Sequence, residues 1–157
     1  MTNVNHAEVA SVLNRAADLI EERGWGTGNR AMRMDGSPLC LEGGIAAALG
    51  MEPTLLLDEV GYVVNHGELA RCPAYEAVKS FLGDRCRNTV LDVQDADLWA
   101  WNDTVAKSAA EVIEVLRAAA AIEQSKADAE RTDSGYDSAT EAKAVGRAMA
   151  TALVEFR

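Results

Sequence analysis

The chain has 157 residues and a mass of 16.8 kDa, which suits one domain with length left over for an arm. Hydrophobic residues make up 48% of it and charged residues 25%, a globular balance that excludes wholesale disorder. Because 25 acidic and 15 basic residues give a net charge of −10, the chain repels phosphate backbones, and we expect no nucleic-acid binding.

The first predicted element is a helix between Asn5 and Gly24. Asn5 is the expected N-cap, with Glu8 three residues on in the capping-box position. Gly24 is the expected stop, since glycine adopts a left-handed φ without penalty. Apolar residues recur at three- and four-residue steps and form one stripe: Val9, Val12, Leu13, Ala16, Leu19 and Ile20.

A glycine-rich loop follows, and a second helix is predicted to end at Gly50. Ser37 is its expected N-cap and Pro38 its first residue. Gly43 and Gly44 give this helix a thin face that a neighbouring backbone can approach closely. We therefore expect it to be the central helix of the core.

Two further helices are predicted to begin at prolines. Pro53 begins a third helix that ends near Gly67, and Pro73 begins a fourth that ends at Gly83. The inner face of the fourth helix is expected to carry Tyr75, Val78, Phe81 and Leu82.

The segment 84–103 has an irregular pattern. Residues 88–93 and, earlier, 30–34 fit short strands, so the sequence predicts at most a minor β-hairpin. If the chain near Trp99 and Trp101 is extended, the two indoles lie on opposite sides, with Trp101 in the core and Trp99 partly exposed.

The C-terminal part begins with a capping box of Ser108 and Glu111, which predicts a fifth core helix to about residue 123. The sequence thus predicts a mainly α protein: a compact five-helix domain over 1–123, a polar linker over 124–137, and a C-terminal amphipathic helix over 138–157. The apolar stripe of that last helix must be covered. We expect a homodimer with this stripe in the interface, through Val145, Met149, Leu153 and Phe156.

No metal, cofactor or membrane span is expected. Cys40, Cys72 and Cys86 show no CxxC spacing, and together with His66 they match no compact zinc motif. The odd cysteine count and the lack of an export signal predict reduced thiols and a cytoplasmic location in a bacterial host. No apolar run approaches the roughly 18 residues of a membrane span.

Cys40 is the sharpest candidate for catalysis. A thiol in the first turn of a helix is stabilised as thiolate, and His66 and Asn102 would complete a papain-like arrangement. Against this, Glu42 lies two residues away and opposes a thiolate. The alternative, which we favour, is that Cys40 is a buried and unreactive thiol at a tight helix contact.

A second candidate site is formed by Trp99, Trp101, Asn102 and Asp103. A tryptophan beside an amide and a carboxylate can hold a small planar ligand or a partner. In the structural alternative, which we favour, Asn102 and Asp103 satisfy backbone N–H groups of a turn and Trp101 anchors that turn in the core.

Three segments resemble a small uncharacterised family of actinobacteria and their bacteriophages. They are AADLIEERGW at 16–25, CLEGGIAAALG at 40–50, and WND followed by EVIEVLRAAA within 101–120. The resemblance implies a compact helical domain and a host range. It does not imply any particular activity. It does not reach the last helix.

Taken together, we expect a binding protein rather than an enzyme. An acidic, phage-like, cytosolic accessory protein suits the sequestration of a host protein or of a small signalling molecule. Two alternatives are a cysteine-dependent amide hydrolase or transferase that uses Cys40, and a virion or assembly component that self-associates through its last helix.

Overall fold

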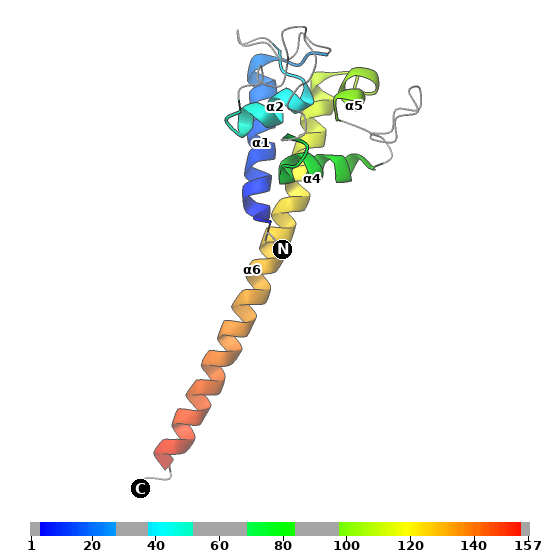
Figure 1. The fold of residues 1–157 in the computed structure, drawn as a ribbon. Coiled ribbons are helices and arrows are strands. Elements are labelled where there is room, and N and C mark those ends of the chain that lie inside the picture. The colour runs from blue at the N-terminus through cyan, green and yellow to red at the C-terminus, as the bar shows by residue number, and fades with distance from the viewer. Residues whose placement is uncertain (1–3, 28–37, 52–68, 84–97, 155–157) are drawn as a thin grey trace. The chain divides into compact units, whose positions relative to one another are not determined.

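The computed structural model describes the backbone of residues 4–27, 38–51, 69–83 and 98–154, and the side chains of these residues except Trp99 and those after residue 133. The described residues form five helices and no strand (Figure 1): α1 His6–Arg23, α2 Leu41–Ala48, α4 Pro73–Leu82, α5 Leu98–Thr104 and α6 Ala109–Val154. The predicted mainly α fold is therefore confirmed. The chain divides into two units, Met1–Gln124 (unit 1) and Ser125–Arg157 (unit 2). The predicted third helix and both short strands lie outside the described residues.

Helix α1 begins and ends where the sequence predicts. The Asn5 side chain accepts a hydrogen bond from the Glu8 N–H at 3.2 Å. At the other end Gly24 has a φ of +86° and donates its N–H to the Ile20 carbonyl at 2.9 Å. Both caps act on neighbouring residues, so local sequence is sufficient to place them.

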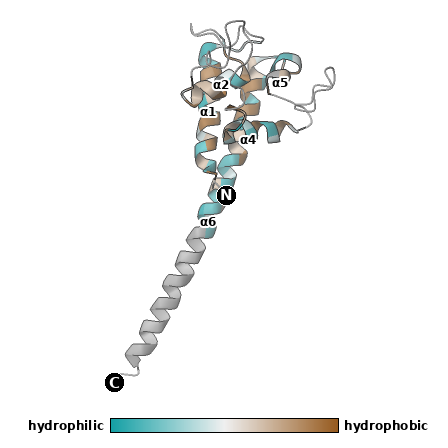
Figure 2. Cartoon of the chain, viewed as in Figure 1, coloured by the Kyte–Doolittle hydropathy of each residue, from teal (hydrophilic) through white to brown (hydrophobic). Residues whose placement is uncertain are grey.

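Helix α2 packs closely on α1, as its thin face predicts. A Cβ on Gly44 would lie 2.8 Å from Ile20 Cδ1 and 3.5 Å from the Ala16 carbonyl oxygen, so only glycine fits without a shift. Hydrophobic residues gather on the helices of unit 1, shown in brown in Figure 2.

The start of α2 differs from the prediction. Its N-cap is Cys40 rather than Ser37, and the Cys40 Sγ accepts the Gly43 N–H at 3.2 Å. Helix α2 begins later than predicted because Leu39, just before it, forms an isolated β-bridge with Trp25, which follows α1. Leu39 donates to the Gly24 carbonyl at 2.9 Å and accepts from the Gly26 N–H at 3.1 Å, which keeps Leu39 extended.

Helix α4 follows the prediction, with Pro73 in its first turn and Gly83, at a φ of +52°, after its end. Its N-cap is a second cysteine, Cys72, whose Sγ accepts the Tyr75 N–H at 3.3 Å. Of the predicted inner residues, Phe81 is partly buried, and the others are fully or almost fully buried: Tyr75, Val78 and Leu82.

Residues 98–104 form helix α5, so the extended chain on which the opposite placement of Trp99 and Trp101 depends is not formed. A helical backbone places Leu98, Trp101 and Asn102 on one face, because they are three and four residues apart. All three are buried in the core, as expected for Trp101. In the sequence, Trp99 and Trp101 are separated by one alanine, which matches the two-residue period of a strand and favours an extended chain over a helix.

Helix α6 begins at its predicted cap. Ser108 Oγ accepts the Glu111 N–H at 3.3 Å, and a Glu111 carboxylate oxygen accepts the Lys107 N–H at 2.9 Å. The helix is continuous through residues 124–137, which the sequence predicts as a linker. That stretch contains no proline, and its single glycine costs a helix only about 1 kcal/mol.

The core of unit 1 draws on every described helix. Its largest fully buried apolar side chains include Leu13, Ile20, Leu41, Ile45, Leu69, Leu98 and Leu116. None of the described helices is both long enough and apolar enough to cross a membrane.

Candidate functional site

Cys40 is buried, as predicted, with 4% of its surface exposed. The pKa of its thiol is raised to about 12, mainly by burial, while the Gly43 N–H lowers it and the charges of Glu42 and Asp103 add to the rise. The nucleophilic form of a cysteine is the thiolate, so this environment opposes nucleophilic catalysis at neutral pH. The N-cap position of Cys40 serves helix α2 instead.

Asn102 is fully buried on α5, and its carboxamide is saturated with hydrogen bonds. The oxygen accepts from Trp25 Nε1 at 2.8 Å and from the Leu41 N–H at 3.0 Å. The nitrogen donates to the Gly26 carbonyl at 3.2 Å and to Asp103 Oδ1 at 2.8 Å. Because the first two partners only donate and the last two only accept, the amide orientation is fixed. This geometry supports the structural interpretation of Asn102.

The structure brings some of the predicted site residues together. Cys40 and Asn102 are neighbours, since the residue after Cys40 donates its N–H to Asn102. Trp101 is buried in the core, and Asp103 is exposed beside Asn102. The structure does not describe the side chains of the remaining predicted site residues, which are His66, Trp99, Val145, Met149, Leu153 and Phe156.

A buried pair that the sequence analysis missed connects α2, α4 and α5. Glu42 is fully buried, and its Oε1 accepts the Tyr75 hydroxyl at 3.1 Å. The same hydroxyl oxygen accepts the Leu98 N–H at 3.2 Å. The signal was visible in the sequence as a single acid inside the otherwise apolar segment 40–50, because a buried carboxylate needs partners.

A second missed pair joins the first and last helices of unit 1. His6 Nδ1 lies 2.5 Å from Glu123 Oε2, and Glu123 is buried. The two residues are 117 positions apart, so no local pattern could connect them. Elsewhere in the described part of the chain, no group of three or more His, Cys, Asp or Glu residues is arranged to hold a metal ion.

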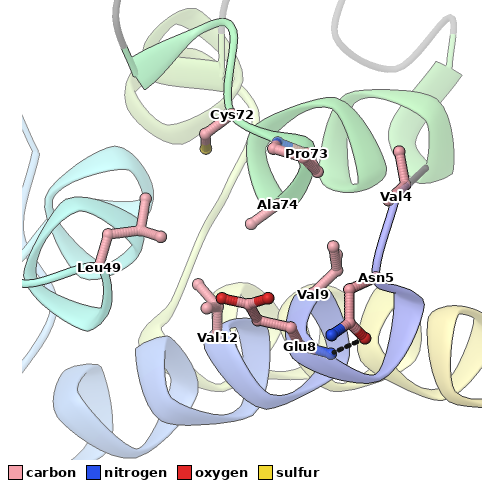
Figure 3. A pocket seen from close by; sticks show the side chains of 9 residues that line it. All are labelled: Val4, Asn5, Glu8, Val9, Val12, Leu49, Cys72, Pro73 and Ala74. Atoms are coloured by element: carbon pink, nitrogen blue, oxygen red, sulfur yellow. Dashed lines mark hydrogen bonds between the residues drawn. The ribbon is translucent and has the colours of Figure 1, made fainter. Parts of the chain in front are cut away.

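One pocket lies where α1, α2 and α4 meet, and we call it the α1–α4 pocket (Figure 3). Its volume is about 290 Å³. Figure 3 shows Leu49 and Val4 on opposite sides of it; these two apolar side chains are 39% and 38% exposed. The pocket is lined by Val4, Asn5, Glu8, Val9, Val12, Leu49, Cys72, Pro73 and Ala74.

The chemistry of the α1–α4 pocket is apolar with few polar groups. Burial raises the pKa of the Cys72 thiol, so this side chain is neutral near pH 7. Pro73 has no N–H, and the Tyr75 N–H already bonds to Cys72 Sγ, so the start of α4 offers few donors to an anion. The carboxylate of Glu8 opposes an anion further. The pocket therefore suits an apolar group.

Another pocket lies between α4, α5 and the first turns of α6, and we call it the α4–α6 pocket. Its volume is about 220 Å³. Two aromatic rings and two carboxylates contribute to its wall. It is lined by Phe81, Trp101, Val105, Glu111, Glu114, Val115 and Ala118.

The described part of unit 1 is a small α-helical domain whose surface carries the α1–α4 pocket and the α4–α6 pocket. The chain belongs to a family of unknown function, DUF6197, whose model matches residues 4–122. The expected membership of an uncharacterised small domain family is thereby confirmed. The match ends close to the boundary between the two units. No curated protein and no solved structure matches the chain.

Proposed function

We propose that this protein is a non-enzymatic binding protein that recognises a partner protein through the α1–α4 pocket. The observation that carries the proposal is the size and chemistry of that pocket. Its volume of about 290 Å³ lies just below the range of roughly 300–1,000 Å³ typical of small-molecule sites. A mainly apolar pocket of this size suits one side chain of a partner, such as leucine or phenylalanine.

The state of the candidate catalytic residues supports binding over catalysis. The raised pKa of Cys40 opposes thiolate formation, and the Asn102 carboxamide is committed to four bonds within the domain. Among the functions expected from the sequence, we therefore favour sequestration of a host protein. We favour it over sequestration of a small signalling molecule and over a cysteine-dependent amide hydrolase or transferase.

The setting of this activity is also a proposal. We place the protein in the cytoplasm of actinobacteria or of cells infected by their bacteriophages. The support is the resemblance of the three segments within residues 16–120 and the two free cysteines among the described residues, Cys40 and Cys72, which suit a reducing compartment.

A homodimer is the oligomeric state we propose. Helix α6 continues to Val154, and the sequence of its unit 2 part carries an apolar stripe that includes Val145, Met149 and Leu153. An isolated amphipathic helix is marginal in water, so a second copy of the same stripe is a natural cover for it.

The proposed partner site is tested by capture from an actinobacterial lysate with matched surface variants. Leu49→Lys places a charge at the pocket rim, whereas Ile122→Lys changes a residue of similar exposure, 45%, that does not line either pocket. We expect the natural protein and Ile122→Lys to retain the same partner and Leu49→Lys to lose it.

Alkylation of Cys72 provides a second readout in the same experiment. Because Cys72 lines the pocket, a bound partner should slow its reaction with N-ethylmaleimide, as followed by peptide mass spectrometry. Equal capture by both variants, together with unchanged Cys72 alkylation, would overturn the proposal.

A further inference from the structure

The α4–α6 pocket combines apolar and aromatic walls with negative charge. Phe81 on α4 and Trp101 on α5 contribute rings, while Glu111 and Glu114 contribute carboxylates from the start of α6. One Glu111 oxygen accepts the Lys107 N–H. The Glu114 carboxylate makes no hydrogen bond or ion pair within the described part of the chain. Its charge is therefore available to an incoming group.

The arginine closest to these acids along α6 is committed elsewhere. The guanidinium of Arg117 donates to Asp18 Oδ1 at 2.8 Å and to Asn14 Oδ1 at 3.3 Å, both on α1. A further acid of α1, Glu21, lies 3.8 Å from the same guanidinium. This cation therefore serves the contact between α1 and α6 rather than the carboxylates of the pocket.

We propose that the α4–α6 pocket receives a lysine or arginine side chain of the partner protein, an inference that rests on the proposed binding function. The apolar stem of such a side chain would pack on Phe81, Val105 and Val115, and its cationic head would meet Glu111 and Glu114. Aromatic rings also attract cations. An anionic group is disfavoured by the same carboxylates.

The size of the pocket agrees with this occupant. About 220 Å³ is less than small-molecule sites usually provide, yet it accommodates one long side chain. An exposed ion pair alone contributes little to affinity. A cation whose stem is enclosed by apolar walls contributes more, which is why arginine is enriched among the residues that dominate interfaces.

The inference is tested first with a small probe on the full-length protein. The ¹⁵N-labelled protein is titrated with n-butylguanidinium and, as a neutral control of the same shape, with n-butylurea. We expect n-butylguanidinium to bind in roughly the millimolar range, given its few atoms, and to shift the amide signals of Phe81, Trp101 and Glu114. Added salt should weaken this binding.

Two matched variants locate the charge that matters. Glu114→Gln should weaken n-butylguanidinium binding several-fold, whereas Glu22→Gln, an exposed change on α1, should leave it unchanged. Equal binding of n-butylurea, or no shift at these residues, would overturn the inference.

Capture of the partner from lysate, compared between the Leu49→Lys and Glu114→Lys variants, tests this inference separately from the proposed function. We expect Glu114→Lys to reduce capture at least several-fold while the domain stays folded, because Glu114 is exposed. Capture that is lost in Leu49→Lys and fully retained in Glu114→Lys would overturn the inference and leave the proposed function standing. Capture that neither variant reduces would overturn both.

Discussion

The indole N–H of Trp25 donates to the carboxamide oxygen of Asn102 across 2.8 Å, although 77 positions separate the two residues in the chain. The same oxygen accepts the Leu41 N–H at the start of α2. One buried side chain on α5 thus connects the end of α1 with the beginning of α2. This arrangement explains why a short helix without a strong sequence pattern has a fixed place in the domain.

We predict that Asn102→Leu destabilises the protein by about 2–4 kcal/mol. The change leaves the buried Leu41 N–H without its partner and removes the acceptor of the Trp25 indole, and each lost partner costs about 1–3 kcal/mol. Urea denaturation followed by circular dichroism measures the loss. As a control, Asn14→Ala removes an exposed amide on α1 and should cost less than about 0.5 kcal/mol.

A second prediction concerns the contact between Gly44 and Ile20. Gly44→Ala should destabilise the domain by about 1–2 kcal/mol, because the added Cβ would lie 2.8 Å from Ile20 Cδ1 in a packed core. Ile20→Val removes that atom and should relieve the cost in the double variant. A double-mutant cycle measures the coupling, and strictly additive effects would contradict a direct contact between these side chains.

The third prediction concerns Cys40 and pH. Burial raises the pKa of Cys40 from 9.0 to about 12, so between these values the unfolded chain has lost a proton that the folded chain retains. Stability should therefore fall as pH rises through this range, by up to about 1.4 kcal/mol per pH unit. Comparison of urea denaturation of the natural protein and Cys40→Ala isolates this contribution. A difference between the two that does not change with pH would contradict the prediction.

The reactivity of the same thiol gives a fourth prediction. In the folded protein at neutral pH, Cys40 should react with iodoacetamide far more slowly than the half-buried Cys72. Cys40→Ser should cost only about 1 kcal/mol, since burial of a hydroxyl is offset in part because serine is a better N-cap. Alkylation of Cys40 faster than that of a free thiol would instead favour the cysteine-dependent alternative.

The fifth prediction is that unit 2 mediates dimerisation. Val145→Glu combined with Leu153→Glu should convert a dimer into a monomer in light scattering, because both changes place charge in the apolar stripe. Thr151→Glu, which falls outside the stripe in the helical repeat, should leave the dimer intact. A natural protein that is monomeric at high concentration would contradict the prediction.

Sequence alone placed those features that depend on neighbouring residues. The caps Asn5, Gly24, Pro73 and Gly83 act within one helical turn, so their residue types are sufficient to predict them. The start of α2 was missed because it depends on Leu39, which bonds to the chain that follows α1. Helix α5 was missed because its stability comes from tertiary packing rather than from its own pattern.

The pockets could not be predicted from sequence for the same reason. The α1–α4 pocket joins Val4, Leu49 and Cys72, which come from three separate segments. Individually, an exposed valine or leucine carries no signal, because such residues are common on protein surfaces. These residues indicate a binding site only once the fold brings them together in one pocket.

The two thiol caps have a practical consequence. Cys72 lines the α1–α4 pocket, whereas Cys40 is enclosed in the core, so the natural chain carries its own attachment point for disulfide-tethered fragments. With Cys86 replaced by serine, a library of thiol-bearing fragments can be screened by intact-protein mass spectrometry under alkaline conditions, because burial raises the pKa of the Cys72 thiol and the thiolate is the form that exchanges. Fragments retained against a reductant would outline the shape of the partner side chain that the pocket accepts, before any partner is isolated.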